Sequence, residues 1–120
     1  MERRGQKYHR ERMGEALREE IETIVEGELG DPRIGLVSVS SVQVADDSRS
    51  ARVFVAVEGD EEEAEDSLEG LTAAVGYIRR VVAERLHLRR PPELYFQLDR
   101  SQHYGARIDE LLGRAKKRKR

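Results

Sequence analysis

The sequence predicts a single α+β domain in which a three-stranded sheet carries helices on one of its faces. Two observations support this fold class. Apolar residues recur every three or four positions in two long segments, which is the period of an amphipathic helix, and they alternate in short segments, which is the period of a strand. With 120 residues the chain can enclose one modest core. We expect residues 1–113 to form this domain, with residues 1–8 flexible and residues 114–120 a disordered basic tail.

The first helix is expected over residues 11–28. Its apolar side chains form one stripe: Met13, Leu17, Ile21, Ile24 and Val25. Gly30 can end this helix, and the segment GDPRIG that follows is typical of a turn. Because Asp31 favours turns and Pro32 lacks an N–H, we expect Asp31, Pro32 and Arg33 to form a turn motif.

Two strands are expected next. In LVSVSSVQV, residues 36–44, the valines change parity between Val39 and Val42, which predicts a β-bulge or burial on both faces. In ARVFVAV, residues 51–57, apolar and polar positions alternate without interruption. The polar segment ADDSRS lies between these two segments, so the strands should form an antiparallel hairpin.

A second long helical pattern follows, with a glycine near its middle. Its apolar face is formed by Leu68, Leu71, Val75, Ile78 and Val82. Gly76 interrupts this pattern, and an interior glycine costs about 1 kcal/mol relative to alanine. This cost indicates that a reason other than helix propensity places glycine here, and a kink is one such reason.

The Pro-Pro pair at residues 91–92 cannot continue a helix, so it ends the second helical pattern. ELYFQLD, residues 93–99, alternates and predicts a third strand. A short C-terminal helix is expected after it, on the spacing of Tyr104, Ile108, Leu111 and Leu112.

Charge is distributed unevenly along the chain. The segment EGDEEEAEDSLE, residues 58–69, holds eight of the 24 acidic residues and none of the 22 basic ones. The net charge of −2 therefore hides a remainder that is basic, with 22 bases against 16 acids. Most of these bases are arginine, whose planar guanidinium binds phosphates bidentately and stacks on nucleobases. The pattern favours a nucleic-acid partner, although dense charge can also serve only to solvate a surface.

The sequence shows no pattern of a catalytic or metal site. It has no cysteine, which excludes disulfides and thiolate chemistry. Asp99, Ser101 and His103 lie close together in the chain, but catalytic triads are usually assembled from separated segments, and helix capping explains Asp99 and Ser101 better. The histidines have no metal-ligand spacing, and no nucleotide-binding fingerprint occurs. We expect a protein that is not an enzyme and needs no metal or cofactor.

No apolar run approaches the roughly 20 residues that span a bilayer, and the charged start of the chain is not followed by the apolar region of a secretory signal. We therefore expect a cytoplasmic protein without a membrane partner. We also expect it to act as a monomer.

The order helix–strand–strand–helix–kink–helix–strand resembles the type II KH domain, an RNA-binding fold. Ordinary KH domains join their central helices by a GxxG loop that clamps the nucleic-acid backbone, and here Ala74-Val75-Gly76 stands in its place. With GDPRIG, ARVFVAV, GYIRR and LRRPPELYFQLDRS following in order over residues 8–112, the chain resembles the bacterial ribosome-binding factor A family. The resemblance implies that the kink lies at Ala74, Val75 and Gly76, where small residues would let the chain bend and the helices approach closely.

That resemblance implies a protein that binds the immature small (30S) ribosomal subunit and its 16S rRNA. It also implies a role in late maturation of the subunit, including in the cold, with other assembly factors acting nearby. The alternative is a protein-interaction module that uses the acidic segment 58–69 and the face of Phe54 to bind a basic partner. The salt dependence of binding would separate the two functions, because phosphate contacts weaken steeply with salt.

Arginines are the candidate RNA contacts. The buried direction of the helix after the kink is set by Val75, Ile78 and Val82. Arg80 then points to water, Arg79 lies on the flank, and Arg85 falls at the edge of the apolar stripe. The candidates in the domain are Arg79, Arg80, Arg89 and Arg90, and those near the chain ends are Arg10, Arg12, Lys116, Lys117 and Arg118. Each of them can also be an ordinary solvated side chain.

Overall fold

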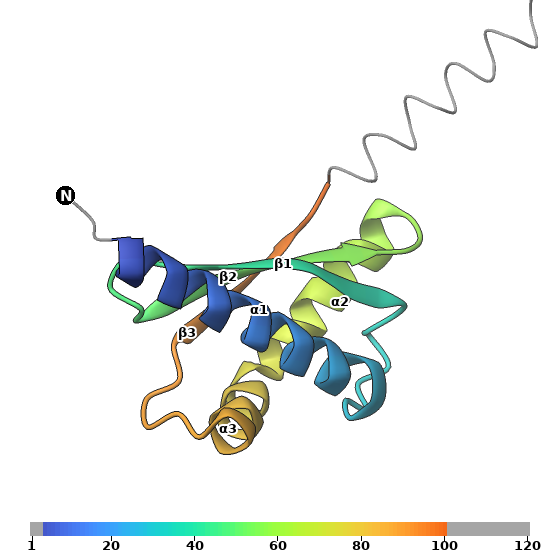
Figure 1. Cartoon of the computed structure of the whole chain (residues 1–120). Helices are drawn as coiled ribbons and strands as arrows, with labels where there is room; N and C mark the ends of the chain where they lie inside the picture. The colour runs from blue at the N-terminus through green and yellow to red at the C-terminus, as the bar shows by residue number, and fades with distance from the viewer. Residues whose placement is uncertain (1–3, 101–120) are drawn as a thin grey trace, which may run out of the picture.

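Three strands form one mixed sheet, and the helices gather on one of its faces (Figure 1). The computed structural model describes residues 4–100. Its elements in chain order are α1 (Arg4–Gly27), β1 (Val37–Val44), β2 (Ser50–Val57), α2 (Glu61–Ala73), α3 (Val75–Leu86) and β3 (Glu93–Leu98). This arrangement confirms the predicted α+β class and the predicted order of elements. The expected C-terminal helix and the basic tail lie outside the described residues.

The sheet has the order β1-β2-β3, with β1 antiparallel and β3 parallel to β2. The hairpin of β1 and β2 is therefore confirmed. Val39 pairs with Val55 and Ser41 pairs with Phe54, so Ser40 is the extra residue of a β-bulge. The bulge explains the change of parity in the sequence, because it lets Val39 and Val42 both turn toward the helices.

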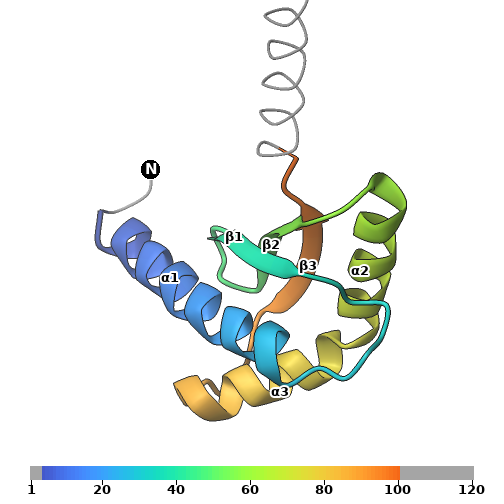
Figure 2. The same ribbon diagram turned by 90° about the vertical axis from the view of Figure 1, so that its right-hand side faces the viewer.

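The core lies between the sheet and the three helices (Figure 2). Residues with no exposed surface come from every helix and from β2, and they are Leu17, Ile21, Ile24, Val53, Val55, Leu71 and Ile78. Along β2 the buried residues alternate with exposed or half-buried ones, as the sequence predicts. Each amphipathic element thus covers the same apolar layer.

The first helix begins at Arg4, seven residues before the predicted start at residue 11. Residues 4–10 have no apolar stripe that could reveal the helical period, but they include good helix formers such as Gln6 and Lys7. The expected flexibility of residues 1–8 stays a prediction. Further along α1, a Cβ added to Gly14 would lie 2.8 Å from the Val42 carbonyl oxygen, so this glycine lets the helix pack directly on β1.

The GDPRIG segment lies in the loop between α1 and β1 and is held by hydrogen bonds. One Asp31 carboxylate oxygen accepts a hydrogen bond from the Arg33 N–H at 2.9 Å, and the Arg33 guanidinium donates to both oxygens. These hydrogen bonds lower the pKa of Asp31. The Ser67 hydroxyl of α2, which is 1% exposed, accepts from the Gly35 N–H at 3.0 Å. The turn residues therefore fix the loop against α2.

A second close contact holds the same loop. A Cβ added to Gly70 would lie 2.7 Å from Cγ1 of Ile34, so α2 carries glycine where the loop presses against it. The start of α2 is stabilised by Asp60, whose side chain accepts a hydrogen bond from the Glu63 N–H at 2.8 Å. Three glutamates lie in the first turn, where negative charge is favourable. Much of the acidic segment thus has a local structural role.

The predicted break between α2 and α3 is confirmed, but its expected cause is wrong. The helices separate at Ala74, which has φ −89° and ψ 1°. Gly76 is already the second residue of α3, has no positive φ, and would have nothing within 4 Å of an added Cβ. No close approach and no special backbone conformation therefore requires glycine at this position.

Candidate nucleic-acid interface

The start of α3 presents an aromatic and basic pair to solvent. Tyr77 is 39% exposed, and the guanidinium carbon of Arg80 lies 5.5 Å from the centroid of the Tyr77 ring. This is a cation–π arrangement, which holds the arginine in place. Gly76 is exposed directly before Tyr77, so the backbone is also open here. The sequence analysis missed Tyr77, although its spacing of three residues from Arg80 on a helix could have indicated the pair.

Arg79 has a different environment from Arg80. Its Nε donates to the Pro92 carbonyl at 3.0 Å, and its Nη2 donates to the Pro91 carbonyl at 2.9 Å. A carboxylate oxygen of Glu93 lies 3.4 Å from Nη2. Arg79 therefore ties α3 to the loop before β3. The sequence places Arg79 on the flank of the helix but does not predict these partners, which engage its guanidinium.

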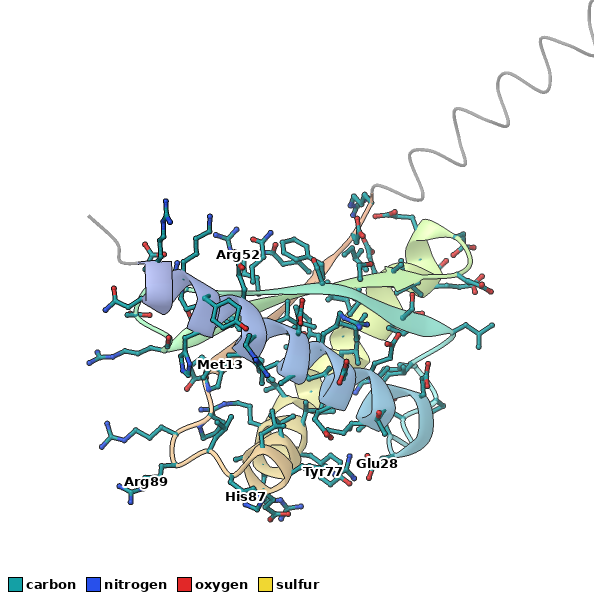
Figure 3. All side chains as sticks on the ribbon, in the orientation of Figure 1. Met13, Glu28, Arg52, Tyr77, His87 and Arg89 are labelled. Atoms are coloured by element: carbon teal, nitrogen blue, oxygen red, sulfur yellow. The ribbon has the colours of Figure 1, made fainter. Side chains whose placement is uncertain are left out.

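Arg89 and Arg90 are exposed in the loop between α3 and β3 (Figure 3). The end of this loop is fixed to the end of the β1–β2 turn, because the Glu93 N–H donates to the Arg49 carbonyl at 2.9 Å. Arg52 lies opposite Tyr95 in the next part of the sheet. We call Arg49, Arg52, Arg89 and Arg90 the basic end of the molecule. Within residues 4–100 no ion pair engages the side chains of these four arginines.

The basic candidates of α1 are separated from α3. The Arg10 side chain is 14% exposed and lies 3.6 Å from the Asp46 carboxylate in the β1–β2 turn. Arg12 is exposed, lies over the Tyr8 ring at 5.8 Å and donates a hydrogen bond of 3.2 Å to the Tyr8 hydroxyl. That hydrogen bond raises the pKa of Arg12. Arg10 thus contacts the β1–β2 turn, and the same turn carries Arg49 of the basic end.

Lys116, Lys117 and Arg118 lie outside the described residues. Arg85 does lie at the edge of the apolar stripe, but its partners were not predicted. Its guanidinium contacts the carboxylates of Glu28, directly after α1, and of Glu20 on α1, and these contacts raise its pKa. Arg85 therefore joins α3 to α1 and is occupied by structural ion pairs.

One hollow of the described structure contains none of these arginines and tyrosines. This hollow of about 530 Å³ between the end of α1 and the β1–β2 hairpin is lined by apolar residues such as Val25 and Val57 and by the acids Glu26, Glu58 and Asp99. Among residues 4–100 no group of three or more metal-ligating side chains could hold an ion. No helix in that part of the chain is long and apolar enough to cross a membrane. The exposed arginines and tyrosines are therefore the functional candidates.

Comparison with known proteins agrees with this geometry. The family model described as ribosome-binding factor A matches residues 9–112. A ribosome-binding factor A from Koribacter versatilis is 63% identical over 119 residues, which cover 99% of this chain and 97% of the relative. One from Halothermothrix orenii is 49% identical over 105 residues, which cover 88% of this chain and 86% of the relative.

Solved structures give the same result. The crystal structure of ribosome-binding factor A from Thermus thermophilus has a TM-score of 0.67 at 26% identity and covers 77% of this chain and 98% of its own. A homology model of the Thermus thermophilus factor, fitted into a cryo-EM map of its complex with 30S, has a TM-score of 0.55 at 32% identity and covers 75% of this chain and 90% of its own. The chain belongs to the ribosome-binding factor A family.

Proposed function

We propose that this protein binds the immature small (30S) ribosomal subunit, contacts its 16S rRNA and assists late maturation of the subunit, including in the cold. It acts in the cytoplasm as a monomer, by binding rather than by catalysis, and other assembly factors act nearby. The observation that supports this most is family membership over nearly the whole chain. A relative fitted into a map of a complex with 30S supports the small subunit as the partner.

The start of α3 is our proposed contact with rRNA. Arg80 supplies a charge for phosphate, and its contact with Tyr77 reduces the number of rotamers it must give up on binding. Tyr77 offers an aromatic edge and face on which an unpaired base can stack. The exposed backbone at Gly76 lets a sugar–phosphate chain approach closely. Charge, ring and open backbone thus meet within five residues of α3.

The test is a titration of purified small subunits with Arg80→Glu. We expect affinity to fall about tenfold or more, since a charge-assisted contact is lost and a negative charge faces phosphate. Arg18→Glu is the matched control, because it makes the same charge change on α1, at a side chain whose partner is Glu22. Circular dichroism should show both variants folded. Equal affinity of Arg80→Glu and the wild type would refute the assignment of this RNA contact.

The same assay tests the alternative function. If the acidic segment bound a basic ribosomal protein, Arg80→Glu would bind normally and replacing Glu61, Glu62 and Glu63 with glutamine would abolish binding. Sedimentation of cell extract through a gradient tests the function as a whole. We expect the protein to travel with free small subunits, and equal distribution among small subunits, large subunits and 70S particles would contradict the proposal.

A further inference from the structure

The face of the sheet that points away from the helices carries an unusual mixture of side chains. We call it the open face, and its members are Ser38, Ser41, Gln43, Arg52, Phe54, Tyr95 and Gln97. Tyr95 is 57% exposed and Arg52 is exposed, while Phe54 is half-buried. Within residues 4–100 no helix covers this face, and Arg52 projects from it on the side opposite to α3 (Figure 3). An exposed tyrosine beside an exposed arginine here has no evident role in folding.

The strand register sets these side chains in two rows across the sheet. Arg52 has Gln43 as its partner on β1 and Tyr95 as its partner on β3. Phe54 has Ser41 on one side and Gln97 on the other. Neighbouring strands are about 4.8 Å apart, so members of one row are within mutual reach. Each row thus combines one aromatic ring with hydrogen-bonding groups.

The charge around this face favours a polyanion. Arg49 lies in the β1–β2 turn, directly before the strand that carries Arg52, whereas Arg89 lies on the helix side of the sheet (Figure 3). Glu93, at the start of β3, pairs with Arg79 of α3 at 3.4 Å, so its carboxylate is held by the helical layer and does not add negative charge to the open face. Arg52 on the open face and Arg49 in the adjoining turn therefore supply positive charge beside the aromatic rings.

Aromatic rings on adjacent strands, amide groups and arginines together match the chemistry of single-stranded RNA. Unpaired bases can stack on tyrosine and arginine and present their edges to amides, and their phosphates follow the positive margin. A duplex cannot offer its bases in this way, because they are stacked inside the helix. A folded protein partner with an apolar surface would use the rings but would leave Arg52 without a counter-charge.

We propose that the open face is a second RNA surface, in which Tyr95 stacks on an unpaired base, Gln43 and Gln97 contact base edges, and Arg52 with Arg49 binds phosphates. The proposal rests on the proposed function, since it assumes an RNA partner. It differs from the contact at Tyr77 and Arg80, because that contact lies in the helical layer. The protein would thereby hold single-stranded RNA on the face that its helices leave uncovered.

The test uses anisotropy of a fluorescent, short oligouridine at low salt, with the full chain. Tyr95→Thr, which keeps a good strand former, should weaken binding about tenfold or more, since stacking on one aromatic side chain has an effect of that size. Tyr95→Phe is the matched control and should bind as the wild type does, because it keeps the ring. Arg52→Gln should weaken binding and lower the log–log salt slope by about 0.7.

Two results would overturn the inference. One is equal affinity of the wild type and a folded Tyr95→Thr for oligouridine, and the other is wild-type protein that does not bind oligouridine at all. Co-sedimentation with small subunits, measured in parallel, separates this failure from failure of the proposed function. In one outcome, the wild type binds small subunits and Tyr95→Thr binds oligouridine as tightly as the wild type does. This outcome would refute the open face as an RNA surface but not the proposed function. Wild-type protein that fails to bind small subunits would refute the proposed function, and the oligouridine titration would still decide the open face.

Discussion

Two glycines in helices should respond oppositely to the same substitution. At Gly14, an added methyl group would lie 2.8 Å from the Val42 carbonyl oxygen, which is fixed in β1, and the next nearest atoms are also on β1. At Gly76, an added methyl group would meet nothing within 4 Å. We predict that Gly14→Ala destabilises the protein and that Gly76→Ala stabilises it.

The magnitudes follow from two opposing effects. Alanine is favoured over glycine within a helix by about 1 kcal/mol, and by about 0.5 kcal/mol near a helix start such as Gly76. At Gly14 this gain is opposed by overpacking, because α1 must move away from a backbone atom, and such insertions cost about 1–3 kcal/mol. The net effect at Gly14 is then a loss of up to about 2 kcal/mol. The two variants should differ by about 2 kcal/mol, which corresponds to about 8 °C in Tm.

Urea denaturation followed by circular dichroism measures this difference directly. The m-values should stay equal, so that a shift in midpoint reports stability. A Gly14→Ala variant as stable as the wild type would show that α1 does not pack against β1 as closely as we describe. A Gly76→Ala variant with a lower midpoint would show that the bend requires glycine after all. If Gly76→Ala is stable but binds small subunits more weakly, the exposed backbone at this position is part of the RNA contact.

Three further predictions concern charged groups. Arg79→Met should lower the free energy of unfolding by about 1–2 kcal/mol, because two proline carbonyls lose their donor at a partly exposed site. Arg80→Met should change the free energy of unfolding by less than about 0.5 kcal/mol. Thermal melts of both variants check this difference. Hydrogen bonds from Arg33 lower the pKa of Asp31 in the folded state, so their stabilisation is fully present above the unfolded pKa of about 3.9 and is lost as pH falls through the lower folded value. Asp31→Asn should therefore lower the urea midpoint at pH 7, with a gap to the wild type that closes well below pH 4; a constant gap would contradict this assignment. Deleting residues 114–120 should weaken RNA binding without lowering Tm, since the segment is basic and nearly without apolar residues, and a large drop in Tm would show a structural role.

Periodicity was sufficient to predict the elements, because each of them buries one face. The change of parity between Val39 and Val42 predicted a β-bulge or burial on both faces, and the register of the strands shows the bulge. The start of α1 could not be predicted in the same way, because residues 4–10 are largely polar on all sides. Where a segment buries nothing, the hydrophobic pattern carries no information on its boundaries.

Contacts between distant segments were beyond the reach of the sequence. Gly14 and Gly76 look alike in a helical pattern, and only the nearby carbonyl of Val42 distinguishes them. A helical wheel predicts the direction of the Arg79 side chain but not its hydrogen bonds to the carbonyls of Pro91 and Pro92. The pairing of Arg52 with Tyr95 depends on the register of two parallel strands, which is set by the length and packing of the two helices between them.

The separation of charge has a consequence for how the protein meets a polyanion. The glutamates at the start of α2 and the basic end lie at opposite ends of the described structure (Figure 1). In the field of a large RNA, such a dipole experiences a torque that turns the arginines forward before any contact forms. When the glutamates of α2 face the RNA, the protein is repelled, and when the arginines face it, the protein is attracted. The separation of charge therefore selects among orientations, and the net charge of −2 does not prevent association. The association rate should then fall steeply with ionic strength, even though the protein and RNA carry net charges of the same sign.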